Sequence, residues 1–139
     1  VTRLGQPDEK EGVVRLERLY GKTLKSISGM HDSSDRIVLT TTDGLKFAMY
    51  HEQDCCENVS VEDVVGDVND LIGYPLLMAE ETSNRGDPPP GCPVDERYGP
   101  DSYTWTFYRF ATVKGYVTVR WYGSSNGYYS EAVYFREVP

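Results

Sequence analysis

The last third of the chain shows a two-residue periodicity of apolar and polar side chains. Aromatic residues and threonines alternate over residues 103–110, and valines and a tryptophan alternate with tyrosine, threonine and arginine over residues 116–122. This period is that of an extended strand with two distinct faces. Residues 114–115 and 124–127 contain the glycines and polar side chains of turns, and residues 133–138 resume the alternation. The pattern predicts three strands in a meander, with the aromatic side chains in the core and on the sheet surface.

The first half of the chain predicts a hairpin. Asp43 and Gly44 separate the alternating runs 36–41 and 45–50, and Asp-Gly between two such runs is a strong hairpin signal. Upstream, Val13, Leu16 and Tyr20 are spaced as on one face of a helix, although the same stretch is also compatible with a strand.

Two segments of similar sequence indicate an internal repeat. Residues 19–24 (LYGKTL) resemble residues 71–76 (LIGYPL), and each copy is followed by strand patterns, a turn ending in glycine, and a polar loop with a doublet. The doublets are Cys55-Cys56 and Tyr128-Tyr129, and the alignment of the following strands matches Glu57 with Glu131. We therefore predict a mainly β fold made of two degenerate four-stranded repeats, packed as a barrel or a sandwich, with at most one or two short helices.

The repeat divides a single predicted domain into consecutive segments. Residues 1–18 form an N-terminal arm, residues 19–64 the first repeat, residues 65–70 a link, and residues 71–138 the second repeat. The second repeat carries an insertion over residues 82–101, whose proline and glycine content predicts a surface loop.

The inward members of the alternating runs define the predicted core. We expect the following residues to be mostly buried: Ile37, Leu39, Leu45, Phe47, Met49, Val59, Val61, Val117, Val119, Trp121, Val133 and Phe135.

The charge distribution bears on the choice of partner. The net charge is −8, and residues 47–84 contain nine acidic residues and no lysine or arginine. Direct nucleic-acid binding is not expected, because no basic stripe is available to replace counterions on phosphates. A basic protein or a cation suits the acidic segment better, and a solvated acidic face that only maintains solubility is the simpler alternative.

No apolar run has the length of a membrane span, and no signal peptide is recognised, so we expect a soluble, intracellular protein that does not bind membranes.

The cysteines, Cys55, Cys56 and Cys92, are odd in number and two are adjacent. This usage fits a reducing compartment, so we expect free thiols. Histidine, cysteine and carboxylates occur together in residues 51–57, but adjacent cysteines on a strand would point to opposite faces, which disfavours a metal site. We expect no metal and no cofactor.

The candidate binding residues come from the two loops that contain the doublets. If the halves are duplicates, these loops occupy related positions, and at least one tyrosine of an extended doublet is available to a partner. The candidate partner-binding residues are Asp54, Cys55, Cys56, Glu57, Asn126, Tyr128, Tyr129 and Glu131. The alternative is that SNGYY is only a turn with its flanking strand.

Six strings carry a resemblance over residues 19–138: TTDG, DCCE, GDVNDLIG, YTWTFY, KGYVTVRWYG and SNGYYSE. In these strings the chain resembles a family of small uncharacterised proteins encoded mainly by bacteriophages and prophages. The resemblance implies a phage origin, a location in the host cytoplasm or in the virion, and no known activity. The resulting hypothesis is a non-enzymatic accessory protein that binds a protein partner, in one version as an acidic inhibitor of a host nucleic-acid-binding protein. The alternatives are a small metal-dependent or carboxylate enzyme centred on Asp54–Glu57 and a virion structural component.

Overall fold

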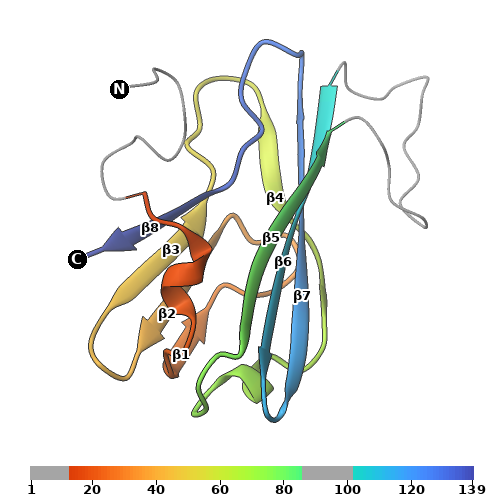
Figure 1. The fold of residues 1–139 in the computed structure, drawn as a ribbon. Helices are drawn as coiled ribbons and strands as arrows, with labels where there is room; N and C mark the ends of the chain where they lie inside the picture. The colour runs from red at the N-terminus through yellow and green to blue at the C-terminus, as the bar shows by residue number, and fades with distance from the viewer. Residues whose placement is uncertain (1–12, 86–101) are drawn as a thin grey trace.

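The computed structural model describes residues 13–85 and 102–139, and these residues form two separate antiparallel sheets. The sheets have the strand orders β1-β2-β3-β8 and β4-β7-β6-β5 and lie as two layers (Figure 1). In chain order the elements are η2 (Leu16–Leu19), β1 (Leu24–Ser28), β2 (Arg36–Thr41), β3 (Lys46–Tyr50), β4 (Asn58–Val65), η3 (Val68–Leu71), β5 (Met78–Arg85), β6 (Ser102–Thr112), β7 (Gly115–Ser125) and β8 (Tyr134–Val138). The prediction of a mainly β chain is confirmed. The described strands fit two packed sheets rather than one closed barrel.

One hydrophobic core lies between the two sheets. It contains inward side chains of both, such as Ile37 and Phe47 from the first sheet and Val119 and Trp121 from the second. All residues of the predicted core are buried except Leu45, which is half-buried. Leu45 lies at the β2–β3 turn, where its carbonyl accepts a hydrogen bond from the N–H of Thr41 (2.8 Å). The alternation therefore predicted the core because each inward residue occupies the same face of a paired strand.

Each sheet takes three consecutive strands from one half of the chain and one strand from the other half. β4 leaves the first half and pairs with β7, while β8 leaves the second half and pairs with β3. Two connections, β3 to β4 and β7 to β8, consequently cross between the sheets at the same end of the molecule (Figure 1).

The two similar hexapeptides, residues 19–24 and 71–76, lie side by side and make matching hydrogen bonds. The N–H of Gly21 donates to the carbonyl of Leu76 (2.9 Å), and the N–H of Gly73, 52 positions after Gly21, donates to the carbonyl of Leu24 (3.0 Å). Thr23 and Pro75 form a β-bridge between the same segments. This reciprocal arrangement agrees with an approximate twofold relationship, whereas the duplication of the sequence itself stays a prediction.

One predicted element boundary was wrong, and one stretch that the sequence left open forms a short helix. Residues 82–85, assigned to the insertion loop, belong to β5, where they pair with residues 104–107 of β6. The bias toward proline and glycine starts only at Gly86, so the preceding polar residues could extend the strand. In the ambiguous stretch after Val13, the chain forms the short 3₁₀ helix η2, which buries Leu16 and Leu19 and leaves Tyr20 exposed.

Several predictions concern residues outside the described ranges. These are the N-terminal arm up to residue 12, the insertion from residue 86 to residue 101, and Cys92. Among the described residues, no helix has the length and apolar character required to cross a membrane.

Candidate functional site

The two loops predicted to bind a partner lie next to each other. Residues 51–57 connect β3 to β4, and residues 126–133 connect β7 to β8. Tyr50 at the end of β3 is paired with Tyr134 at the start of β8, and Asn58 at the start of β4 is paired with Ser124 near the end of β7. Both loops therefore begin and end beside each other, and the exchange of strands between the sheets places them together. We call residues 51–57 and 125–132 the paired-loop surface.

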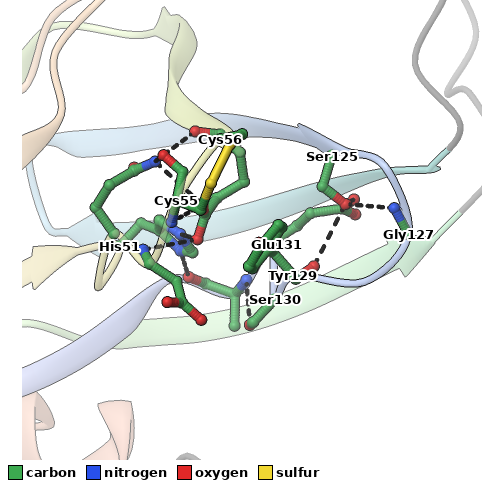
Figure 2. Close-up of polar contacts among 12 residues, drawn as sticks. His51, Cys55, Cys56, Ser125, Gly127, Tyr129, Ser130 and Glu131 are labelled. Atoms are coloured by element: carbon green, nitrogen blue, oxygen red, sulfur yellow. Dashed lines mark hydrogen bonds and ion pairs between the residues drawn. A yellow bond between two sulfur atoms is a disulfide. The ribbon is translucent and has the colours of Figure 1, made fainter.

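His51 links the two loops through both ring nitrogens. Its Nδ1 lies 2.7 Å from the carbonyl oxygen of Ala132, and its Nε2 lies 2.9 Å from a carboxylate oxygen of Glu57 (Figure 2). The side chains of His51 and Glu57 are 3% and 0% exposed. A carbonyl and a carboxylate are both acceptors, so the two hydrogen bonds form together only when both ring nitrogens carry a proton. The two ring nitrogens thus contact one loop and the other.

The Glu57 carboxylate is the internal anchor of the first loop. It accepts hydrogen bonds from the N–H groups of Asp54 (3.0 Å) and Cys55 (2.8 Å), and from the side-chain amide of Gln53 (3.1 Å), as well as from His51. Burial raises the pKa of Glu57, but the hydrogen bonds from His51 and from the backbone outweigh it and lower the pKa to about 2. Glu57 is therefore ionised at neutral pH, and its oxygens are used to hold the loop.

Cys55 and Cys56 form a disulfide (Figure 2). The expectation of free thiols at these positions was wrong. It assumed that adjacent cysteines occupy an extended strand, on which they would point to opposite faces. Both residues instead lie in a bend before β4, and hydrogen bonds from Asp54 and Cys55 to Glu57 shape the backbone there. Both cysteines are exposed, so the disulfide lies on the paired-loop surface.

The Glu131 carboxylate is the corresponding anchor of the second loop. It accepts hydrogen bonds from the hydroxyls of Thr104 (2.7 Å) and Ser125 (2.5 Å), and the residue is 7% exposed. Its Cβ lies above Gly123, where an added methyl group would come within 2.9 Å of it. Glu57 and Glu131, which the sequence comparison aligned, are thus both buried carboxylates that hold a loop. Both carboxylates therefore accept hydrogen bonds from the described residues around them.

Tyr128 is a large, exposed side chain of the paired-loop surface. It is 83% exposed, and its ring contacts the half-buried Tyr129 edge to face, with ring centroids 5.0 Å apart. The turn is fixed locally: Asn126 Oδ1 accepts from the N–H of Tyr128 (2.9 Å), and Ser125 Oγ accepts from the N–H of Gly127 (3.0 Å). Gly127 has φ +91°, a conformation that favours glycine. An exposed aromatic side chain is therefore presented on an ordered turn.

A groove of about 600 Å³ runs beside this turn. Its lining comes from β5, β6 and the second loop: Glu81, Ser83, Arg85, Thr104, Thr106, Gly127, Tyr128, Tyr129, Ser130, Glu131, Ala132 and Val133. Glu81 lies opposite Tyr108 of β6. Desolvation raises the pKa of the Glu81 carboxyl, and burial raises the pKa of Tyr108 well above its ordinary value. The sequence pattern did not predict this β5 wall, because residues 82–85 were assigned to a loop.

The acidic segment is partly neutralised by arginines from β7 and β8. Arg120 contacts Glu62 (2.7 Å) and Asp63 (4.0 Å), and Arg136 contacts Glu52 (2.9 Å). Residues 47–84 therefore do not present all their carboxylates as one unpaired acidic face.

The described residues offer no obvious metal ligands in the paired-loop surface. They contain no group of three or more histidine, cysteine or acidic residues arranged to hold a metal ion. The two cysteine sulfurs are bonded to each other, and the Glu57 carboxylate already accepts from several N–H donors.

The chain belongs to a protein family whose sequence model it matches. The family is described as "Domain of unknown function (DUF7448)", and its model matches residues 17–135. No curated protein matches the chain, and no solved structure matches it. The matched region includes both hexapeptides, the whole paired-loop surface and the first two residues of β8.

Proposed function

We propose that the chain is a protein-binding module and that the paired-loop surface is its binding site. The observation that carries the proposal is the position of the His51 imidazole, which contacts Ala132 in one loop and Glu57 in the other. Two loops that are distant in sequence are thereby held as one surface before any partner binds. A preorganised surface loses less conformational entropy on binding than two independent loops would.

The chemistry exposed on this surface suits a protein partner. Tyr128 provides a large amphipathic contact on a fixed turn, and tyrosine supplies contact area with few rotatable bonds. The adjacent groove offers polar and charged groups, including Glu81 and Arg85, that can fix the orientation of a bound side chain. The resemblance to phage-encoded proteins leads us to propose a bacterial host protein as the partner.

The narrower versions of the hypothesis have less support. An inhibitor that imitates nucleic acid needs a row of free negative charges, and Arg120 and Arg136 pair with several carboxylates of the acidic segment. The enzyme and virion alternatives are favoured by no contact, cavity or charge arrangement among the residues that the structure describes.

Affinity capture from host cells tests the proposal. Tagged wild-type protein is expected to retain a specific host protein, and a Tyr128→Ala, Tyr129→Ala double variant is expected to lose it. Tyr116→Ala is the matched control, because Tyr116 is also well exposed (66%) but lies at the opposite end of β7. Circular dichroism verifies that every variant is folded. If the folded double variant captures the same proteins as the wild type, the binding site lies elsewhere.

A further inference from the structure

The Cys55–Cys56 disulfide is an exposed, reducible bond on the paired-loop surface. Both cysteines are exposed, so a thiol can reach the sulfur atoms without unfolding the domain. The same residues belong to the hydrogen-bonded loop: the N–H of Cys55 donates to Glu57 (2.8 Å), and the side-chain amide of Gln53 donates to the carbonyl of Cys55 (3.2 Å). A chemical change at the sulfurs therefore acts on the backbone that positions Glu57.

We propose that Cys55 and Cys56 form a redox-modification site, in which reduction of the disulfide to a dithiol changes the conformation of the paired-loop surface. Its reaction partner is a cellular dithiol reductant. The consequence for partner binding rests on the function proposed above, whereas the redox chemistry and the conformational change do not.

The reaction is a two-step thiol–disulfide exchange. A thiolate of the reductant attacks one sulfur of the pair, the bond between the two cysteine sulfurs breaks, and the released cysteine thiolate takes up a proton. The second thiol of the reductant, as its thiolate, then attacks the mixed disulfide and releases the other cysteine. In total the protein disulfide gains two electrons and two protons, and the dithiol reductant is oxidised to its own disulfide.

The structure indicates how the change passes to the second loop. The disulfide holds two adjacent side chains on the same side of the backbone, whereas free adjacent side chains in an extended chain point to opposite sides. Reduction releases this restriction next to Cys55, whose N–H binds Glu57. Glu57 in turn binds His51, and His51 binds the carbonyl of Ala132. The disulfide is therefore connected to the second loop by consecutive hydrogen bonds. They join Cys55 to Glu57, Glu57 to His51, and His51 to Ala132.

Thiol counting on the folded protein tests the redox part. Without reductant, an alkylating agent is expected to modify no more than one cysteine, Cys92, which lies outside the described residues. After treatment with dithiothreitol under native conditions, the number of modified cysteines should rise by two. Modification of Cys55 and Cys56 without reductant, or no rise after it, would overturn the proposal. A Cys92→Ser variant is the matched control, since it should lower both counts by at most one and keep the increase of two.

Amide NMR spectra of the oxidised and reduced protein test the conformational part. We expect the largest shifts at residues 53–57 and further shifts at Ala132 and its neighbours. A Cys55→Ser, Cys56→Ser variant should reproduce the reduced spectrum in the second loop and should not respond to reductant. Changes confined to residues 53–57 would refute a redox-dependent surface. Because neither experiment uses a partner, their outcome is independent of the capture experiment that tests the proposed function.

Discussion

His51 and Ala132 are 81 positions apart in sequence, and the histidine Nδ1 lies 2.7 Å from the carbonyl oxygen of the alanine. This hydrogen bond joins the β3–β4 loop to the β7–β8 loop. Since the other ring nitrogen contacts Glu57, one side chain connects the disulfide-containing loop to the loop that presents Tyr128. The proposed binding surface and the proposed transmission of a redox change to the second loop both depend on this connection.

Replacing His51 should separate the two loops. His51→Ala removes both hydrogen bonds and leaves the buried Glu57 carboxylate with one donor fewer, so we expect a lower urea midpoint and amide shifts at Ala132. The matched control is His31→Ala, because His31 is exposed and its ring contacts the backbone carbonyl of its neighbour, Asp32. An unchanged Ala132 amide signal in His51→Ala would show that the imidazole does not link the loops.

The stability of the protein should depend on the ionisation of Glu57. The folded pKa of about 2 lies below the ordinary value of 4.5, so the ionised carboxylate contributes stability above about pH 4.5, and this contribution is lost as the pH falls toward 2. Glu57→Gln removes the ionisable group and places an amide where N–H donors need an acceptor. The wild type and the variant should differ most in urea midpoint near pH 6 and converge toward pH 2. A difference that does not change with pH would contradict the assignment.

Gly123 should not tolerate a side chain. A methyl group there would lie 2.9 Å from the Cβ of Glu131 and 3.0 Å from its carbonyl oxygen. Gly123→Ala should therefore displace Glu131 and destabilise the protein by about 1–3 kcal/mol, as overpacking does in other cores. Ser124→Ala is the control, because the neighbouring residue faces the other side of the strand and is only half-buried. Equal unfolding free energies for the two variants would show that the site can accommodate the methyl group.

The core itself should respond to loss of volume. Val119 is fully buried between the sheets, so Val119→Ala should lower the free energy of unfolding by about 2–3 kcal/mol through lost transfer energy and a residual cavity. Val113→Ala makes the same chemical change at a residue that is 68% exposed, and it should change stability by less than about 0.5 kcal/mol. Denaturant unfolding monitored by circular dichroism measures both. Similar losses in the two variants would contradict the observed packing.

The sequence predicted those parts of the fold that depend on local alternation. Val117, Val119 and Trp121 are buried because side chains two positions apart share a strand face, and this relationship can be read without knowing the partner strand. The order of the strands could not be predicted, because the exchange of β4 and β8 between the sheets depends on contacts between the two halves of the chain.

The sequence marked the two candidate loops but not how they are built. The doublets at Cys55 and Tyr128 correctly marked two exposed loops, yet nothing in the sequence showed that His51 would bridge them. The disulfide was missed because the local backbone was assumed to be extended. Glu57 and Glu131 were predicted to bind a partner, whereas both are buried and hold the loops through hydrogen bonds. In the sequence, only their aligned positions indicated that the two residues have the same role.

The dissociation constant of the captured partner, measured for one variant in each loop, tests the central claim most directly. Asp54→Ala changes an exposed residue of the first loop and Tyr128→Ala an exposed residue of the second. If the loops form one binding surface, each variant should weaken binding at least about fivefold, which corresponds to about 1 kcal/mol, while Tyr116→Ala should bind as the wild type does. Wild-type affinity in both folded loop variants would contradict the account.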